Sequence, residues 1–132
     1  METCLGVYDG GWGIECCHIP SGSKLHVNPY VGYSPTELCV TALATCTLLK
    51  LGYYAKKHGL NIKGTKFIAT EGYDDCLKRI TTITVVYIMA GGPFTDQDKQ
   101  GFEAAAASCP VHNSLLTEID IKISFNWYGE QN

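Results

Sequence analysis

The chain has 132 residues, of which 45% are hydrophobic and 17% are charged, and its formal net charge at pH 7 is −3. This length suffices for one domain with a hydrophobic core, so we expect a single domain over residues 1–132. Arg79 is the only arginine. Because the sequence offers no basic patch that could neutralise phosphates, nucleic acid is not an expected partner.

The start of the chain and its cysteines bear on its location. Residues 1–4 lack the basic and apolar regions of a signal peptide. The longest apolar run is broken by threonines and Lys50 and is too short to span a bilayer, so we expect no membrane partner. We therefore expect a cytoplasmic protein, in which seven cysteines indicate free thiols rather than a disulfide framework. Their odd number excludes complete intramolecular pairing.

The first 33 residues have the pattern of a small β-meander. Large and small side chains alternate over residues 12–18, which predicts a strand, and residues 25–27 predict a short further strand. Gly10-Gly11 and Ser21-Gly22 supply the turns between strands. The segment therefore predicts a three-stranded antiparallel sheet.

A long helix is predicted over residues 34–59. Ser34 is placed as its N-cap, Pro35 as its first residue, and Glu37 follows the cap by three residues, which together form a capping box. Between residues 38 and 49 the only ionisable side chains are two cysteines. A helix that is apolar on all sides is buried in a core or a subunit interface. We therefore expect this helix, roughly 35 Å long, to be central to the fold.

The remaining elements follow in a regular order. Strands are predicted over residues 65–70 and 80–89, separated by a turn at residues 72–75; a helix begins at Thr95, a short helical turn follows Pro110, and residues 119–127 form the last strand. The order βββ-α-ββ-α-β indicates an α+β fold. We expect its helices to gather on one face of an antiparallel sheet.

Two cysteines lie where chemistry could use them. Cys46 lies in the middle of the long helix, where a free cysteine can equally be a small core residue. Cys109 precedes Pro110, which places its sulfur at a helix N-cap, where unpaired amides and the helix dipole favour a thiolate. An ordinary cap is the alternative for Cys109.

The motifs around these two cysteines resemble the OsmC/Ohr family. They are Ser34-Pro-Thr-Glu-Leu, Ala42-Leu-Ala-Thr-Cys46-Thr and, 63 residues after Cys46, Cys109-Pro-Val-His. The resemblance covers the chain from Tyr30 to the C-terminus in order and spacing, and the N-terminal meander loosely. It implies an OsmC-like fold of antiparallel sheets around a long cysteine-bearing helix, with two chains intertwined as a homodimer.

The same resemblance implies an activity and its residues. Members of the family reduce organic hydroperoxides with a dithiol, such as a lipoyl group, as the reductant. Carried over, Cys46 is the peroxidatic thiol, which is oxidised to a sulfenic acid, and Cys109 is the resolving thiol. No cofactor or metal is implied.

This sequence departs from the family pattern at two positions. The family's peroxidases place a glutamate directly after the proline, whereas this chain has Thr36 there and Glu37 one residue later. The family's N-terminal arginine is missing, and Arg79 lies in another part of the chain. Within one straight helix Glu37 would lie about 13 Å from Cys46 along the axis, which favours a capping role. A supporting role for Glu37 or Thr36 would require a helix break or a second subunit.

These departures leave two functional hypotheses. Without a nearby cation, a buried Cys46 keeps its proton and is a poor nucleophile. The first hypothesis is a thiol-dependent peroxidase that uses Cys46 and Cys109. The second is a non-catalytic OsmC-like dimer that binds a small apolar ligand. Tyrosines that flank the long helix could line a pocket or fill a dimer interface: Tyr30, Tyr33, Tyr53 and Tyr54.

Two histidine-containing groups complete the candidates. His112 follows Cys109 by three residues and could share a helical face with it and supply positive charge, or face solvent. The run Cys16-Cys17-His18, with His26, invites a zinc site. Adjacent ligands on a strand point to opposite faces, and no pair of cysteines has the two-residue spacing typical of zinc ligands, so zinc is disfavoured.

Overall fold

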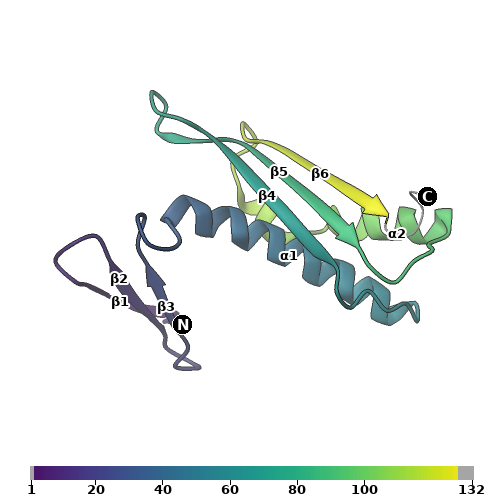
Figure 1. Ribbon diagram of the computed structural model, residues 1–132, viewed down its shortest axis with the longest axis horizontal. Coiled ribbons are helices and arrows are strands. Elements are labelled where there is room, and N and C mark those ends of the chain that lie inside the picture. The colour runs from purple at the N-terminus through teal and green to yellow at the C-terminus, as the bar shows by residue number, and fades with distance from the viewer. Residues whose placement is uncertain (1, 128–132) are drawn as a thin grey trace. The chain divides into compact units, whose positions relative to one another are not determined.

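The computed structural model describes residues 2–127. The chain divides into two compact units, Met1–Cys39 and Val40–Asn132. Along the described residues the elements are β1 (Cys4–Tyr8), β2 (Ile14–His18), β3 (Lys24–Val27), α1 (Pro35–Lys57), β4 (Lys66–Asp74), β5 (Arg79–Met89), α2 (Asp96–Ala106), α3 (Pro110–Ser114) and β6 (Asp120–Trp127) (Figure 1). The predicted order of elements is confirmed.

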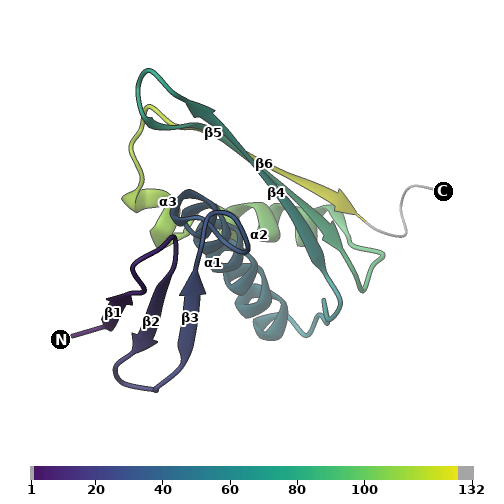
Figure 2. The same ribbon diagram turned by 60° about the vertical axis from the view of Figure 1, so that its left-hand side comes forward.

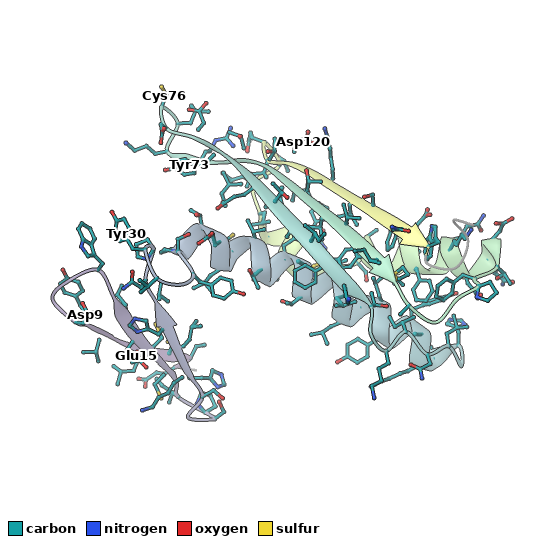
Figure 3. All side chains as sticks on the ribbon, viewed as in Figure 1. Asp9, Glu15, Tyr30, Tyr73, Cys76 and Asp120 are labelled. Carbon is teal, nitrogen blue, oxygen red and sulfur yellow. The ribbon has the colours of Figure 1, made fainter. Side chains whose placement is uncertain are left out.

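The first unit contains a three-stranded antiparallel sheet in the order β1-β2-β3, which confirms the predicted meander. Asp9 shapes the turn between β1 and β2, where its Oδ1 accepts hydrogen bonds from the amides of Gly11 and Gly13 at 2.7 and 3.2 Å (Figure 3). On β2 and β3, His26 Nδ1 meets Glu15 Oε2 at 2.7 Å. Both turns lie at the predicted glycine-containing positions.

The second unit contains a mixed sheet in the order β4-β5-β6. β4 and β5 pair antiparallel, but β6 runs parallel to β5, so the prediction of a wholly antiparallel sheet is wrong. Parallel neighbours need a long crossover, and here α2 and α3 carry the chain from the end of β5 back to its beginning. The helices of this unit lie on one side of the sheet, as expected (Figure 2).

The connection between β4 and β5 differs from the prediction. β4 continues through residues 72–74, where a turn was expected, and its register shifts between Gly72 and Tyr73. A side chain at Gly72 would collide with the hydroxyl of Thr82, so this glycine permits close strand pairing rather than a turn. The hairpin turns after Asp74, whose Oδ1 accepts from the amide of Cys76 at 2.8 Å at the tip of the hairpin (Figure 3).

The core of the second unit lies between one stripe of α1 and the inner face of β5. The buried residues of α1 recur at helical spacing, and those of β5 alternate: Val40, Leu43, Ala44, Thr47, Leu51 and Ala55 on the helix, and Ile83, Val85, Tyr87 and Met89 on the strand. The other side of α1 is open, because Leu49 and Tyr53 are 65% and 66% exposed. A single chain therefore covers only one side of α1, and burial of the other side in a subunit interface stays a prediction.

The length of α1 also bears on the membrane question. As a whole, the helix is 23 residues long and apolar enough to cross a membrane by length and composition alone. The argument that the apolar run within this helix is too short to cross a bilayer therefore does not hold. The buried stripe of α1 in this structure is also the pattern of a core helix in a globular protein.

Candidate thiol site

The structure brings Cys46 and Cys109 together across the 63 residues that separate them in sequence. Cys46 lies in the middle of α1, and Cys109 is the N-cap residue of α3. Their side chains lie close enough for each thiol to change the pKa of the other. Both cysteines are free thiols. Cys109 is fully buried, whereas Cys46 is partly exposed, so reagents from solvent reach Cys46 first.

The short helix α3 positions Cys109. Pro110 occupies the first helical position, as predicted, and holds Cys109 in an extended backbone conformation at the N-cap. The Cys109 sulfur forms no regular capping hydrogen bond. The amides of His112 and Val111 nevertheless face it and favour its thiolate. The first turn of α3 thus contributes the unpaired backbone donors that the sequence predicted there.

The two sulfurs differ in acidity. Burial raises the pKa of the Cys109 thiol, but the Thr47 hydroxyl, the amides of α3 and Cys46 outweigh it and hold the pKa below its ordinary value. Burial raises the pKa of Cys46, and the neighbouring Cys109 raises it further. The pair therefore holds its first negative charge on Cys109 and its proton on Cys46, and the two groups titrate together.

A positive charge that the sequence analysis did not identify lies near Cys46. Lys50 lies four residues further along α1, and its charge lowers the pKa of Cys46, although this effect is smaller than that of burial. The spacing of four residues on a helix could have identified it. Cys46 still keeps its proton more firmly than a free cysteine, as the sequence analysis expected of a buried thiol.

Thr47 and Tyr87 complete the site, and the sequence analysis assigned neither of them to it. Thr47 lies on the buried stripe of α1 beside the Cys109 sulfur and the Tyr87 hydroxyl. Its hydroxyl favours the charged forms of both groups, yet it forms no well-aligned hydrogen bond with any described residue. Thr47 directly follows Cys46, and the buried helical stripe was the signal that could have found it.

Tyr87 anchors the site to the sheet. Its hydroxyl donates a hydrogen bond to the carbonyl oxygen of Ala44 at 2.7 Å, which links β5 to α1. Burial raises the pKa of Tyr87 to about 12, so the phenol remains a donor at physiological pH. Its inward position on an alternating strand was the available signal.

Glu37 and Thr36 lie at the start of α1. Glu37 forms the predicted capping box, because its Oε1 accepts from the Ser34 amide at 2.9 Å and its own amide donates to Ser34 Oγ at 3.2 Å. These hydrogen bonds with Ser34 lower the pKa of Glu37. The Thr36 hydroxyl lies 3.3 Å from Ser34 Oγ. The capping interpretation of Glu37 is confirmed.

Arg79 and His112 take different places. Arg79 begins β5 and donates to the carbonyl oxygen of Ile80 at 3.1 Å. Eight residues of strand separate it from Tyr87, which corresponds to about 26 Å, so it cannot replace the missing arginine at the thiols of its own chain. His112 supplies its amide to Cys109, and its side chain borders a cavity.

This cavity lies between α2, α3 and the inner face of β6 and has a volume of about 540 Å³. Six of the nine residues that line it are apolar, two are polar and one carries a carboxylate: Glu103, Ala106, Ala107, His112, Ile121, Ile123, Ser124, Phe125 and Trp127. The flanking tyrosines proposed as a pocket lining are not among them. Tyr54 instead stacks on His58 and meets Phe102 edge to face.

Metal ligation finds no support in the arrangement of side chains. Within residues 2–127 no three histidine, cysteine or acidic side chains are grouped so that they could hold a metal ion. Cys16 and Cys17 point to opposite faces of β2, as expected for neighbours on a strand.

The fold and the paired cysteines define a class of small α+β proteins with a two-thiol site. The family model described as OsmC-like protein matches residues 26–124, which is more than half of the chain. The chain belongs to this family. No curated protein matches the sequence.

Solved structures show the same fold over nearly the full chain. A Psychrobacter arcticus protein named for osmotic stress induction and a detoxification response has a TM-score of 0.90 at 23% identity, covering 96% of each chain. An OsmC-like protein from Mycoplasma pneumoniae has a TM-score of 0.77 at 16% identity, covering 96% of this chain and 94% of that one. The organic hydroperoxide resistance protein OhrB of Bacillus subtilis has a TM-score of 0.66 at 16% identity, covering 95% and 98%. At these identities the likeness establishes the fold.

Proposed function

We propose that this protein is a thiol-dependent peroxidase that reduces organic hydroperoxides through Cys46 and Cys109. The observation that carries the proposal is the thiol pair itself, in which two neighbouring sulfurs change each other's pKa beside the amides of α3. Two proteins of the same fold, from Legionella pneumophila and Bacillus subtilis, are named for organic hydroperoxide resistance. The proposal includes a cytoplasmic location, where dithiol reductants are available.

The division of access and acidity between the two sulfurs suggests how the pair would react. Cys46 is the more accessible sulfur, but it carries the proton. Transfer of that proton to Cys109 would leave a Cys46 thiolate, which attacks the outer oxygen of the hydroperoxide. The O–O bond breaks, Cys46 becomes a sulfenic acid, and the leaving alkoxide takes the proton from Cys109 to form the alcohol, which leaves Cys109 as a thiolate again.

The second half of the cycle restores the thiols. The Cys109 thiolate attacks the Cys46 sulfur, the S–O bond breaks, and the leaving hydroxide takes a proton from solvent to become water as the disulfide forms. A dithiol then reduces the disulfide and is itself oxidised. The buried Thr47 hydroxyl, which lacks a well-aligned partner among the described residues, is available to donate to the Cys109 thiolate or to a substrate oxygen. Neither Thr36 nor Glu37 is needed for these steps, and His112 contributes through its amide.

We propose that the working form is a homodimer, as the family resemblance implies. The exposed stripe of α1 that includes Leu49 and Tyr53 is apolar, and an unpartnered apolar helix face favours association. The expected result in analytical ultracentrifugation is a dimer at micromolar concentration. A folded monomer at that concentration would contradict the proposal.

The decisive experiment follows the consumption of cumene hydroperoxide with a dithiol reductant in steady state. We expect Cys46→Ser to abolish the rapid turnover that this thiol pair carries. Cys109→Ser should reduce about one equivalent of peroxide per subunit at Cys46 and then lose that rapid turnover, because the sulfenic acid has no partner thiol. Equal residual turnover in both variants would mean that this pair does not carry the activity.

A second candidate is a non-catalytic dimer that binds a small apolar ligand. The cavity beside β6 supports it, since its size and lining suit such a ligand. The same experiment separates the two candidates. A binding protein would leave Cys46 and Cys109 reduced in the presence of cumene hydroperoxide, and Ala107→Trp, at an exposed position of the cavity lining, would abolish ligand binding without affecting these thiols.

A further inference from the structure

A second pair of cysteines lies in the first unit, on one face of its sheet. Cys4 on β1 pairs with His18 on β2, and Gly6 pairs with Cys16. Side chains two residues apart on a strand share a face. Cys4 and Cys16 are therefore diagonal neighbours on the same face, and the position directly across from Cys16 carries no side chain.

The pairing brings these two thiols into contact. Backbone hydrogen bonds join Ile19 to Thr3 at 2.9 Å and Asp9 to Gly13 at 3.1 Å. Hydrogen-bonded pairs alternate with pairs that are not hydrogen-bonded, so the pair of Cys4 with His18 is of the second type, in which opposite residues lie closest together. Burial raises the pKa of the Cys16 thiol, and the neighbouring Cys4 thiol raises it further. The two thiols are therefore close neighbours on this face of the sheet.

Reagents can reach this pair. Cys4 is exposed, Cys16 is partly exposed, and both are free. A Cβ at Gly6 would make ordinary van der Waals contacts with Ile14 at 3.6 Å and with the Cys16 sulfur at 4.0 Å, so the glycine leaves this side of the Cys16 sulfur without a covering side chain. Cys17, the next residue, points to the opposite face, where it pairs with Leu5 on one side and Lys24 on the other.

We propose that Cys4 and Cys16 form a second redox-active thiol pair, which an organic hydroperoxide oxidises to a reversible disulfide between β1 and β2. The proposal takes its class of oxidant from the proposed function but requires neither Cys46 nor Cys109. One thiolate attacks the peroxide oxygen, giving a sulfenic acid and an alcohol once the alkoxide is protonated. The other thiol then displaces water and forms the S–S bond.

The geometry of the sheet makes this disulfide easy to reduce. Diagonal neighbours in a sheet have Cα atoms about 7–8 Å apart, whereas a relaxed disulfide needs about 4.4–6.8 Å. β1 is an edge strand that pairs with β2 alone, so it can shift by the small distance required. The resulting strain and exposure place the bond among those that a dithiol reduces readily.

The test uses the full chain with the substitution Cys46→Ser. This substitution removes the sulfur that the hydroperoxide would oxidise in the proposed peroxidase cycle. The protein is treated with cumene hydroperoxide, denatured, alkylated with iodoacetamide and weighed intact. We expect two fewer alkylated thiols than in the untreated protein, and full recovery after dithiothreitol. Digestion after Glu15 separates Cys4 from Cys16, whereas trypsin does not, because the first Lys or Arg is Lys24. A linked peptide pair from the first digest identifies the bond.

Cys17→Ser is the matched control, since Cys17 adjoins Cys16 but faces the other way. It should keep the full yield of linked peptide, whereas Cys4→Ser and Cys16→Ser should lose it. An unchanged thiol count, a link that persists in Cys16→Ser, or a bond between two chains on a non-reducing gel would each overturn the proposal. Circular dichroism verifies that each variant is folded. Because Cys46 is absent throughout, these outcomes are independent of whether the protein is a peroxidase.

Discussion

The two units of this protein each bring a pair of cysteines into contact, and the pairs differ in the backbone around them. Cys109 begins a helix, where the amides of the first turn have no partners within the helix and can favour a thiolate. Cys4 and Cys16 lie on paired strands, whose amides are largely used by the ladder. A thiol pair on a helix start and one on a sheet are therefore different chemical sites.

The comparison extends to acidity and access. The pKa of Cys109 is lowered despite its burial, whereas burial and the neighbouring Cys4 raise the pKa of Cys16. The first pair is acidic but shielded, because Cys109 is fully buried. In the second pair Cys4 is exposed and Cys16 is partly exposed, but the pKa of Cys16 is raised. Acidity in this protein comes from hydrogen-bond donors placed by the fold, and not from exposure to water.

Thr47→Val should produce the largest change among the supporting residues. A hydrogen bond to a charged group contributes about 1.5–3 kcal/mol, so we expect the rate of disulfide formation, in which the Cys109 thiolate is the nucleophile, to fall roughly 10- to 100-fold at pH 7. Stability should stay constant or rise, because the substitution removes a buried hydroxyl that lacks a well-aligned partner. Stopped-flow kinetics and urea unfolding measure the two effects.

Thr45→Val is the control for that substitution. Thr45 is exposed on the same helix, and its hydroxyl donates to the carbonyl oxygen of Thr41 at 2.9 Å. Its replacement should leave the rate unchanged. If both variants lose the same activity, the hydroxyl at Thr47 has no special role, and the difference between the two thiol pairs would rest on the amides of α3 alone.

Tyr87→Phe tests the link between the site and the sheet. Loss of the hydrogen bond to the Ala44 carbonyl should lower the free energy of unfolding by about 1–3 kcal/mol at pH 7. Because the pKa of Tyr87 is raised from 10.0 to about 12, its stabilising contribution is complete below pH 10 and is lost as the pH rises towards 12. Over that window the wild type should lose roughly 2–3 kcal/mol more than the variant.

Urea unfolding at pH 9, 10.5 and 12 provides the measurement. Tyr73→Phe serves as the control, because Tyr73 lies half-exposed at the β4 bulge. A parallel loss of stability in the wild type and Tyr87→Phe across the alkaline range would show that the Tyr87 phenol does not titrate as its burial implies.

The smallest effects are expected at the start of α1. Ser34→Ala removes the capping hydroxyl and should cost about 1 kcal/mol. The lowered pKa of the Glu37 carboxyl stabilises the fold above the pKa that this group has in the unfolded chain. The wild type loses this stability as the pH falls through the pKa of the folded state. Glu37→Gln should show a smaller change in stability over the same pH range.

The thiolate absorbance at 240 nm shows whether Glu37 does more than cap the helix. If capping is its only role, Glu37→Gln should leave the pH titration of the cysteine pair unchanged. A shifted titration in the purified protein would assign the displaced glutamate to the thiol site.

Local signals in the sequence determined much of this fold. The capping box at Ser34, the N-cap position of Cys109 before Pro110, and the alternation along the last strand each depend on residues close in sequence. The motifs around the two cysteines also indicated the family. Such features can be predicted because backbone capping and side-chain periodicity are set within a few residues.

Only the tertiary structure decided which distant groups meet. The parallel pairing of β6, the one-sided burial of α1 and the placement of Thr47 and Tyr87 beside Cys109 depend on contacts between segments far apart in the chain. The contact of Cys4 with Cys16 depends on strand register, and a shift of one residue would place them on opposite faces. The sequence by itself determined which residues could react, and packing decided which of them are paired, buried and charged.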